Sequence, residues 1–221
     1  MGLRSARMVF RNQNSQVSFT LYPMIHIGDQ QFYEDAFRDA FSHDVALVEG
    51  VRSGIVRNLT RSYRWIALNK LGLVRQPTTP DQYAVSARVV RADLTTEEFH
   101  REWRKIGILL RIFILFAAPL VGLYRRLVAS RDSLARNMCL EDLETSDEIL
   151  DWNPRFEAMY HSILHARDTR LVECVREELE TNREETIAIV YGAAHMRSVI
   201  RELLSCGFHC SQSRWHIVIA T

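Results

Sequence analysis

The sequence predicts an α/β fold in which a mostly parallel central sheet is flanked by helices. Apolar runs rich in β-branched residues alternate with amphipathic helical patterns, an order typical of parallel sheets. The first unit has a strand over 17–27, a helix over 32–41 and a strand over 45–50, about the length of one βαβ crossover. With 221 residues, 47% of them hydrophobic and 25% charged, we expect one α/β domain over 1–221.

The next segments continue the alternation. Residues 52–75 are basic and helix-like, and we expect Trp65 and Leu68 to face inward. Residues 83–94 alternate well enough to predict another strand, which closes at Asp93. The strand ends are of interest because ligands bind beyond the carboxyl ends of parallel strands.

The second half of the chain is predicted to hold a helical insertion followed by a return to the sheet. Thr95 and Glu98 have the spacing of a capping box, and we expect a helical insertion or hairpin over about 100–150. A long helix is expected over 154–181, beginning at an Asn-Pro pair. The last elements are a strand over 187–191, a helix over 196–206 that ends at Gly207, and a strand over 213–221.

The totals exclude several protein classes. The net charge is +1 and the arginines are scattered along the chain, so no nucleic-acid partner is expected. The start of the chain lacks the apolar core of a signal peptide. Four cysteines show no disulfide spacing, which favours reduced thiols and a cytoplasmic location; they are Cys139, Cys174, Cys206 and Cys210.

One apolar segment, residues 106–124, approaches the length of a membrane span. Arg111 interrupts it, and the unbroken part, Ile112–Leu123, is only 12 residues long. That length favours docking over a true span. The segment is therefore expected to contact its own domain, a membrane surface or a second copy of the chain, so membrane association stays open.

Four predicted strand ends carry groups that suit a metal site. His26, Glu49, Asp93 and His195 follow the successive strands. Two imidazoles and a carboxylate from different elements form an open site for a divalent ion such as manganese, cobalt or zinc. The alternative for each histidine is a satisfied polar residue at the edge of the core.

Four stretches in order resemble the TraB/PrgY/GumN family of the TIKI-like superfamily. They are "MIHIGDQQFYEDAFRDAFSHDVALVEG", "ARVVRADLTTEEFHREW", "NPRFEAMYHSILHARDTRLV" and "YGAAHM", and together they extend from about residue 18 to 207. The resemblance implies a metal-dependent hydrolase of peptide or ester bonds. It assigns His26, Glu49 and His195 to the metal or catalytic set, with Asp93 and Arg167 as supporting groups.

The chain departs from the family pattern at four positions, as a divergent member would. Pro23 stands where the first Gly-x-x-His motif has glycine, Leu94 follows Asp93 where arginine is common, and Ala166 and Arg170 replace the Glu and Tyr of the "ERDxY" pattern. These changes keep the proposed ligands and alter the substrate surroundings. A protein that sequesters a peptide or ligand without cleaving it is therefore the alternative.

The roles of the charged groups stay open at this stage. Glu49 has the chemistry of either a metal ligand or a general base. Arg167 has the chemistry to bind an anionic group of the substrate. The alternative role for Arg167 is an ion pair with Asp93 or Glu49.

Two further groups have metal-like spacing. His161 and His165 share one helix face but lack the Glu of the His-Glu-x-x-His motif. Residues 206–210, "CGFHC", lack a fourth ligand for structural zinc. Neither group is expected to bind metal.

Overall fold

The computed structural model describes residues 2–77, 86–143, 164–181 and 184–221, with the side chains of 139–143 left out. Its main element is a six-stranded sheet in the order β6-β4-β7-β2-β1-β8. The strands are β1 (Gly2–Arg11), β2 (Ser18–Met24), β4 (Val45–Val48), β6 (Arg88–Arg91), β7 (Thr186–Gly192) and β8 (His209–Ala220). A small second sheet pairs β3 (Ile27–Gly28) with β5 (Val74–Arg75).

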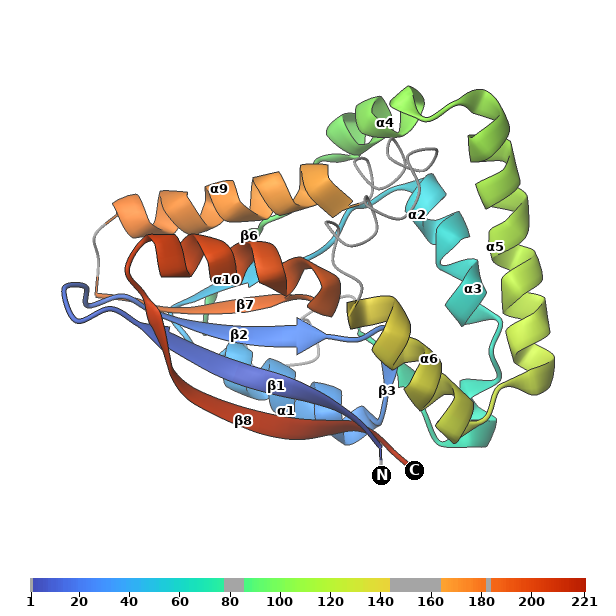
Figure 1. The fold of residues 1–221 in the computed structure, drawn as a ribbon, viewed down its shortest axis with the longest axis horizontal. Coiled ribbons are helices and arrows are strands. Elements are labelled where there is room, and N and C mark those ends of the chain that lie inside the picture. Colours follow the sequence, from blue (N-terminus) through green and yellow to red (C-terminus); the bar gives the residue numbers. More distant parts are fainter. Residues whose placement is uncertain (1, 78–85, 144–163, 182–183) are drawn as a thin grey trace.

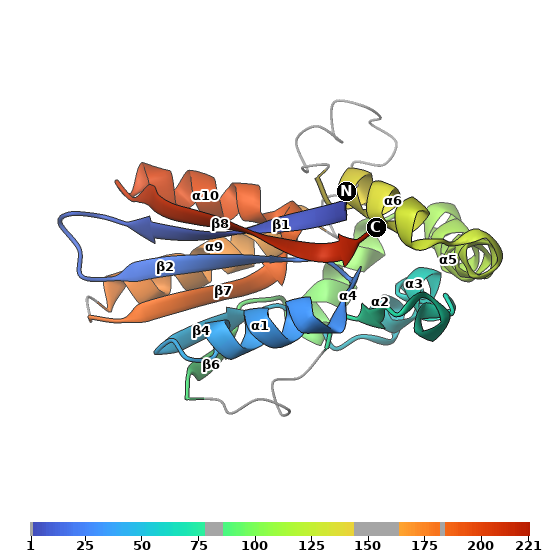
Figure 2. The same cartoon turned by 90° about the horizontal axis from the view of Figure 1, so that it is seen from below.

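Helices surround the main sheet. They are α1 (Gln30–Ala40), α2 (Gly54–Leu59), α3 (Arg61–Arg64), α4 (Thr96–Lys105), α5 (Ile108–Val128), α6 (Arg131–Leu143), α9 (Ala166–Glu180) and α10 (Met196–Ser205), with the 3-10 turns η1 (Leu68–Leu71) and η5 (Ala193–His195). Figures 1 and 2 show α9 and α10 on one face of the sheet and α1 on the other.

The predicted α/β class is confirmed. β2, β7, β4 and β6 are mutually parallel, and β1 runs antiparallel to both of its neighbours. β2, β4 and β7 are short, mostly buried strands because helices cover both of their faces. The edge strand β6 is largely exposed. Residues 187–191 of β7 are all buried, and separate apolar clusters fill the two sides of the sheet.

Local sequence signals set several element ends. Thr95 and Glu98 form the predicted capping box at the start of α4. Gly207 follows α10 with φ of +80°, a conformation that favours glycine, and so ends that helix as predicted. The long helix expected from 154 is described only in its later part, as α9, because residues 144–163 lie outside the described chain.

The edge strands differ from the prediction. β1 over residues 2–11 was not predicted as a strand, and β8 begins at His209 rather than at 213. The two strands pair along almost their whole lengths. Leu68 faces inward as expected, but Trp65 is 40% exposed, so its predicted inward placement is wrong.

A helical arm extends beyond the carboxyl ends of the parallel strands; we define it as residues 51–65 and 96–128, which carry α2, α3, α4 and α5. An apolar cluster built on Phe99, Trp103 and Ile106 joins α4 to α2 and α5. Figure 1 shows α5 at the far edge of the molecule, with α2 and α3 between it and the sheet. By length and composition alone, α5 is the one helix in the described chain able to cross a membrane.

Candidate functional site

The predicted site residues come together in space because each follows a parallel strand. Glu49 comes directly after β4, and Asp93 lies two residues beyond β6. His26 lies two residues beyond β2, and His195 closes the 3-10 turn after β7. Since the four strands are parallel neighbours, these positions share one edge of the sheet.

Arg167 ties two of the strand ends together. It lies in the first turn of α9. Its Nη2 atom is 2.6 Å from Glu49 Oε1 and 2.7 Å from Asp93 Oδ2, and its Nε donates to Asp93 Oδ1 at 3.0 Å. The ion pair that was the alternative interpretation of Arg167 is therefore present with both carboxylates.

Asp93 also holds the neighbouring backbone. Its carboxylate accepts hydrogen bonds from the N–H groups of Gly50 and Leu94, both at 2.9 Å. Its side chain is only 1% exposed. Asp93 thus joins the end of β6 to the turn after β4 and acts as a positioning group within the cluster.

Glu49 is ionised and fully engaged. Burial opposes its charge, but Arg167, followed by His195 and His26, outweighs burial and lowers the pKa of Glu49 from 4.5 to about 2. Oε1 pairs with Arg167, and Oε2 accepts from the Gly192 N–H at 2.8 Å. The carboxylate therefore links β4, β7 and α9 as a fixed negative charge.

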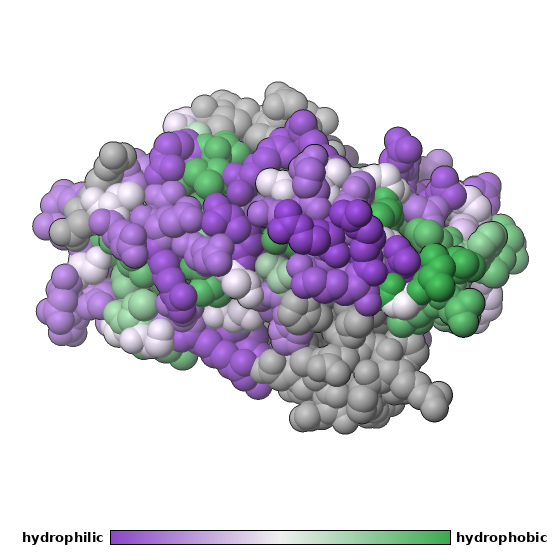
Figure 3. All heavy atoms as spheres, turned by 90° about the horizontal axis from the view of Figure 1, so that it is seen from above, coloured by the Kyte–Doolittle hydropathy of each residue, from purple (hydrophilic) through white to green (hydrophobic). Residues whose placement is uncertain are grey.

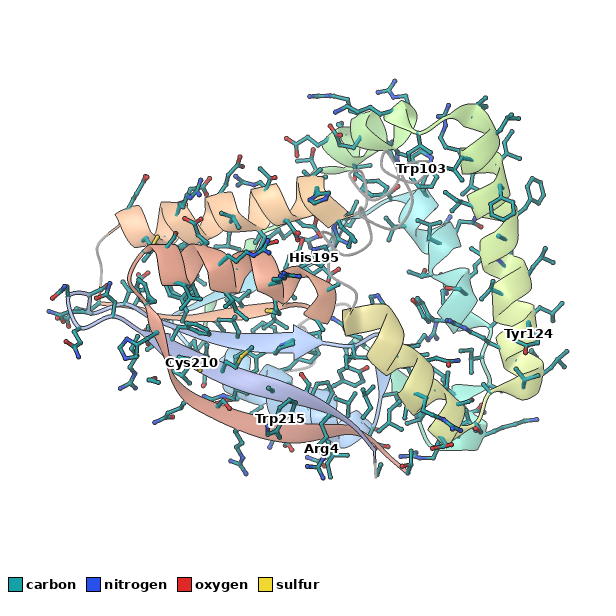
Figure 4. All side chains as sticks on the ribbon, in the orientation of Figure 1. Arg4, Trp103, Tyr124, His195, Cys210 and Trp215 are labelled. Carbon is teal, nitrogen blue, oxygen red and sulfur yellow. The ribbon has the colours of Figure 1, made fainter. Side chains whose placement is uncertain are left out.

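His195 is held by a buried carboxylate. Its Nδ1 lies 2.5 Å from Asp168 Oδ1, and Ser198 Oγ donates to Asp168 Oδ2 at 2.8 Å. The His195 ring packs edge-on against Tyr191, with ring centroids 4.9 Å apart. A carboxylate on Nδ1 fixes the ring orientation and leaves Nε2 as the nitrogen for a ligand or a proton. Figure 4 shows His195 at the turn between β7 and α10.

Gly192 lets the two groups approach each other. A Cβ built at this position would lie 3.2 Å from Glu49 Oε2 and 3.4 Å from His195 Cδ2. The carboxylate and the imidazole therefore flank the space that a side chain would occupy. This is the physical reason for a small residue at the end of β7.

His26 joins the cluster less closely. Its ring lies against Tyr63 of α3, with centroids 5.1 Å apart, and its backbone oxygen accepts from the Gln76 N–H at 2.9 Å. It is also among the groups that lower the pKa of Glu49, after Arg167 and His195. The arm thus reaches the site through Tyr63.

His26, Glu49 and His195 are residue types that bind divalent ions, but they are not arranged as a three-ligand site. Among the described residues, no group of three His, Cys, Asp or Glu side chains is placed to hold an ion. The Asp168–His195 pair is, however, the outer arrangement that metal-bound histidines commonly have. A bound ion would require His26 to turn toward His195 Nε2, and Glu49 to exchange one of its hydrogen bonds to Arg167 or Gly192 for the ion.

The other candidate groups gain no support as metal sites. His161 lies outside the described residues, so its pairing with His165 is untested. Cys206, His209 and Cys210 are exposed at the end of α10 and the start of β8, and in the part of the chain that the structure describes they do not form a three-donor group.

Asp168 is one of two site residues that were not predicted from the sequence. It stands next to Arg167 in the stretch "HARD", so the signal was a carboxylate adjacent to a predicted functional arginine at the start of a helix. Tyr191 was also missed. Its ring lies beneath the Arg167 guanidinium at 5.5 Å, and burial raises the pKa of its phenol well above 10.

The chain matches no protein-family model, no curated protein and no solved structure. The resemblance to the TraB/PrgY/GumN family therefore stays a prediction.

Proposed function

We propose that the strand-end cluster is the active site of a metal-dependent hydrolase of peptide or ester bonds. The observation that supports this most is the His195–Asp168 pair beside an ionised Glu49. Two histidines, a carboxylate and an outer carboxylate are the usual components of a hydrolytic metal centre. The TraB-type resemblance, which assigns His26, Glu49 and His195 to the metal or catalytic set, points to the same reaction.

A divalent ion held by His26, Glu49 and His195 would polarise the substrate carbonyl and make its bound water acidic. The chain's own residues do the rest. Asp168 keeps the His195 ring oriented, and Arg167 keeps Glu49 ionised. Because Glu49 and Asp93 already neutralise Arg167, its role is to position these carboxylates rather than to clamp a substrate.

The test combines metal content and hydrolysis. The purified chain is loaded with manganese, cobalt or zinc, and the bound metal is measured before assay on peptide and ester substrates. Loss of the outer carboxylate in Asp168→Asn should weaken metal binding by about 10- to 100-fold. His26→Ala should weaken metal binding at least as much, since it removes a proposed ligand.

Asp132→Asn is the matched control, because it neutralises an exposed carboxylate on α6. It should leave metal binding and turnover unchanged. A chain that takes up none of the three metals under any loading condition contradicts the proposal, as does hydrolysis that is indifferent to Asp168→Asn.

A non-catalytic protein that sequesters a peptide or ligand is the second candidate. It is favoured by the engagement of both Glu49 oxygens and by the lack of a finished three-ligand group in the described chain. Peptide binding to the metal-free protein, without turnover in the presence of any metal, would support it.

We place either activity in the cytoplasm. The three described cysteines with resolved side chains are free, as a reducing compartment requires.

A further inference from the structure

The most unusual surface of the molecule is the outer side of α5. Six apolar residues spaced three or four apart lie on one side of this helix. We call them the apolar stripe: Leu109, Phe113, Phe116, Leu120, Leu123 and Leu127, which are between 47% and 81% exposed. Figure 3 shows this apolar surface over α5.

The exposed area is too large for an ordinary monomer. With neighbours that include Ile112 and Tyr124, eleven large apolar residues of α5 are at least 41% exposed. At about 200 Å² for a large side chain, they present on the order of 1,000 Å² of apolar surface. The largest apolar patch of a typical monomer is roughly 300–600 Å². Figure 4 shows Tyr124 on the outer side of the helix, away from the sheet.

The helical arm also concentrates positive charge. It contains ten Arg and Lys residues against three Glu, a net charge of +7, whereas the whole chain has +1. Eight of the ten basic residues are exposed: Arg52, Arg57, Arg61, Arg64, Arg101, Arg104, Lys105 and Arg126. The near-zero total hides this asymmetry, so the sequence-based view of scattered arginines is incomplete.

From these two observations, we propose that the helical arm docks the protein on the surface of an anionic lipid membrane. The apolar stripe enters the boundary between headgroups and acyl chains, with α5 parallel to the membrane plane. The arginines of α2 and α3 lie about one interhelical distance behind α5, roughly 10 Å, which is close to the Debye length at physiological salt. They therefore still interact with anionic headgroups.

The positive charge of the helical arm also argues against a second copy of the chain as the partner that covers the apolar stripe. Pairing two stripes would bring two arms of +7 together. An anionic membrane covers the same apolar area and neutralises the charge, because each basic residue near such a surface is attracted to it.

The packing of α5 decides against a membrane span. Asn58 of α2 donates to the Leu115 carbonyl oxygen at 3.0 Å, and Arg125 lies 5.5 Å from the Tyr63 ring. A Cβ at Gly122 would collide with the Arg61 carbonyl oxygen, so α5 and α3 touch backbone to backbone. A spanning α5 would break these contacts or carry the arginines of α3 into the bilayer core.

Vesicle flotation of the purified full chain tests the proposal. Vesicles of phosphatidylcholine with 30% phosphatidylserine are compared with phosphatidylcholine alone at physiological salt. The chain should bind the anionic vesicles more strongly. Phe113→Ser with Phe116→Ser should lower partitioning about 100-fold, from the transfer free energy of two large apolar side chains. Both side chains are at least 65% exposed, so the fold should survive.

Two variants make the test specific. Trp215→Ser with Ile217→Ser removes two side chains of β8 that are 64% and 54% exposed, outside the arm, and should leave partitioning unchanged. Arg57→Gln, Arg64→Gln and Arg126→Gln together should lower binding to anionic vesicles about 10-fold, because two of the three lie about one Debye length behind α5, and leave binding to neutral vesicles unaltered.

Several results would overturn the proposal. The first is failure to bind anionic vesicles, and the second is equal binding by the wild type and the Phe113 and Phe116 variant. A solution dimer that this variant dissolves, without vesicle binding, would assign the stripe to a second copy. Retention in membranes after alkaline carbonate extraction would show a span instead of surface docking.

Discussion

Replacing Arg167 by methionine should destabilise the protein strongly at neutral pH. The substitution leaves the carboxylates of Glu49 and Asp93 buried, at 16% and 1% exposed, without their shared cation. Breaking a buried ion pair from one side costs about 3–5 kcal/mol. The pKa of Glu49 gives a similar figure, because a fall from 4.5 to about 2 corresponds to about 3 kcal/mol.

The pH dependence of the unfolding free energy shows whether the loss of the Glu49 pair causes the destabilisation. A depressed pKa stabilises the fold above the unfolded value of 4.5, and that stabilisation is lost as the pH falls toward 2. The difference in unfolding free energy between wild type and Arg167→Met should therefore narrow by about 2 kcal/mol or more between pH 7 and pH 3. Urea unfolding at both pH values measures it.

Arg176→Met is the control, because Arg176 makes an equally short pair with Glu202 but lies on the surface. It should cost far less, and its difference from the wild type should narrow much less, because Arg176 lowers the pKa of Glu202 in an exposed, solvent-screened pair. The reasoning would be refuted if the difference in unfolding free energy between wild type and Arg167→Met stayed constant from pH 7 to pH 3. A difference below about 1 kcal/mol at pH 7 would also refute it.

Two further predictions concern packing and thiol access. Gly122→Ala should lower the unfolding free energy by about 1–3 kcal/mol, because the new Cβ meets the α3 backbone. In the control Gly54→Ala, the new Cβ meets nothing within 4 Å, so this variant should not be destabilised. Thermal melts compare the two variants, and equal melting temperatures would contradict the described contact. Mapping of alkylated cysteines by mass spectrometry should find Cys206 and Cys210 modified quickly and Cys174 slowly, because Cys174 is buried and burial raises the pKa of its thiol. Equally fast modification of Cys174 would show that the face of α9 carrying it does not pack into the core as described.

The central parallel strands could be predicted because they are buried on both faces. Runs such as "VALV" and "IAIVY" have no polar alternation, and the turns after them are marked by glycine or by a charged residue. β1 escaped prediction because arginines at 4, 7 and 11 interrupt its apolar residues. Its pairing with β8 depends on residues some 200 positions away in sequence, which no local pattern contains.

The candidate site was predictable in location but not in its pairings. The rule that parallel strands end at one edge was enough to group Glu49, Asp93 and His195. It did not decide whether Arg167 clamps an anionic group or pairs with Asp93 or Glu49, because this arginine lies on α9, 74 residues beyond Asp93. Asp168 was missed for the same reason, since only the packing of α9 beside α10 brings it to His195.

The most direct test of the site is a crystal structure from crystals soaked in Mn²⁺, with an anomalous difference map. Our account predicts one peak at about 2.0–2.3 Å from His195 Nε2, with Glu49 and His26 turned toward it and Asp168 still on Nδ1. A map with no peak at the ends of β2, β4 and β7, or with the ion bound elsewhere, would contradict it.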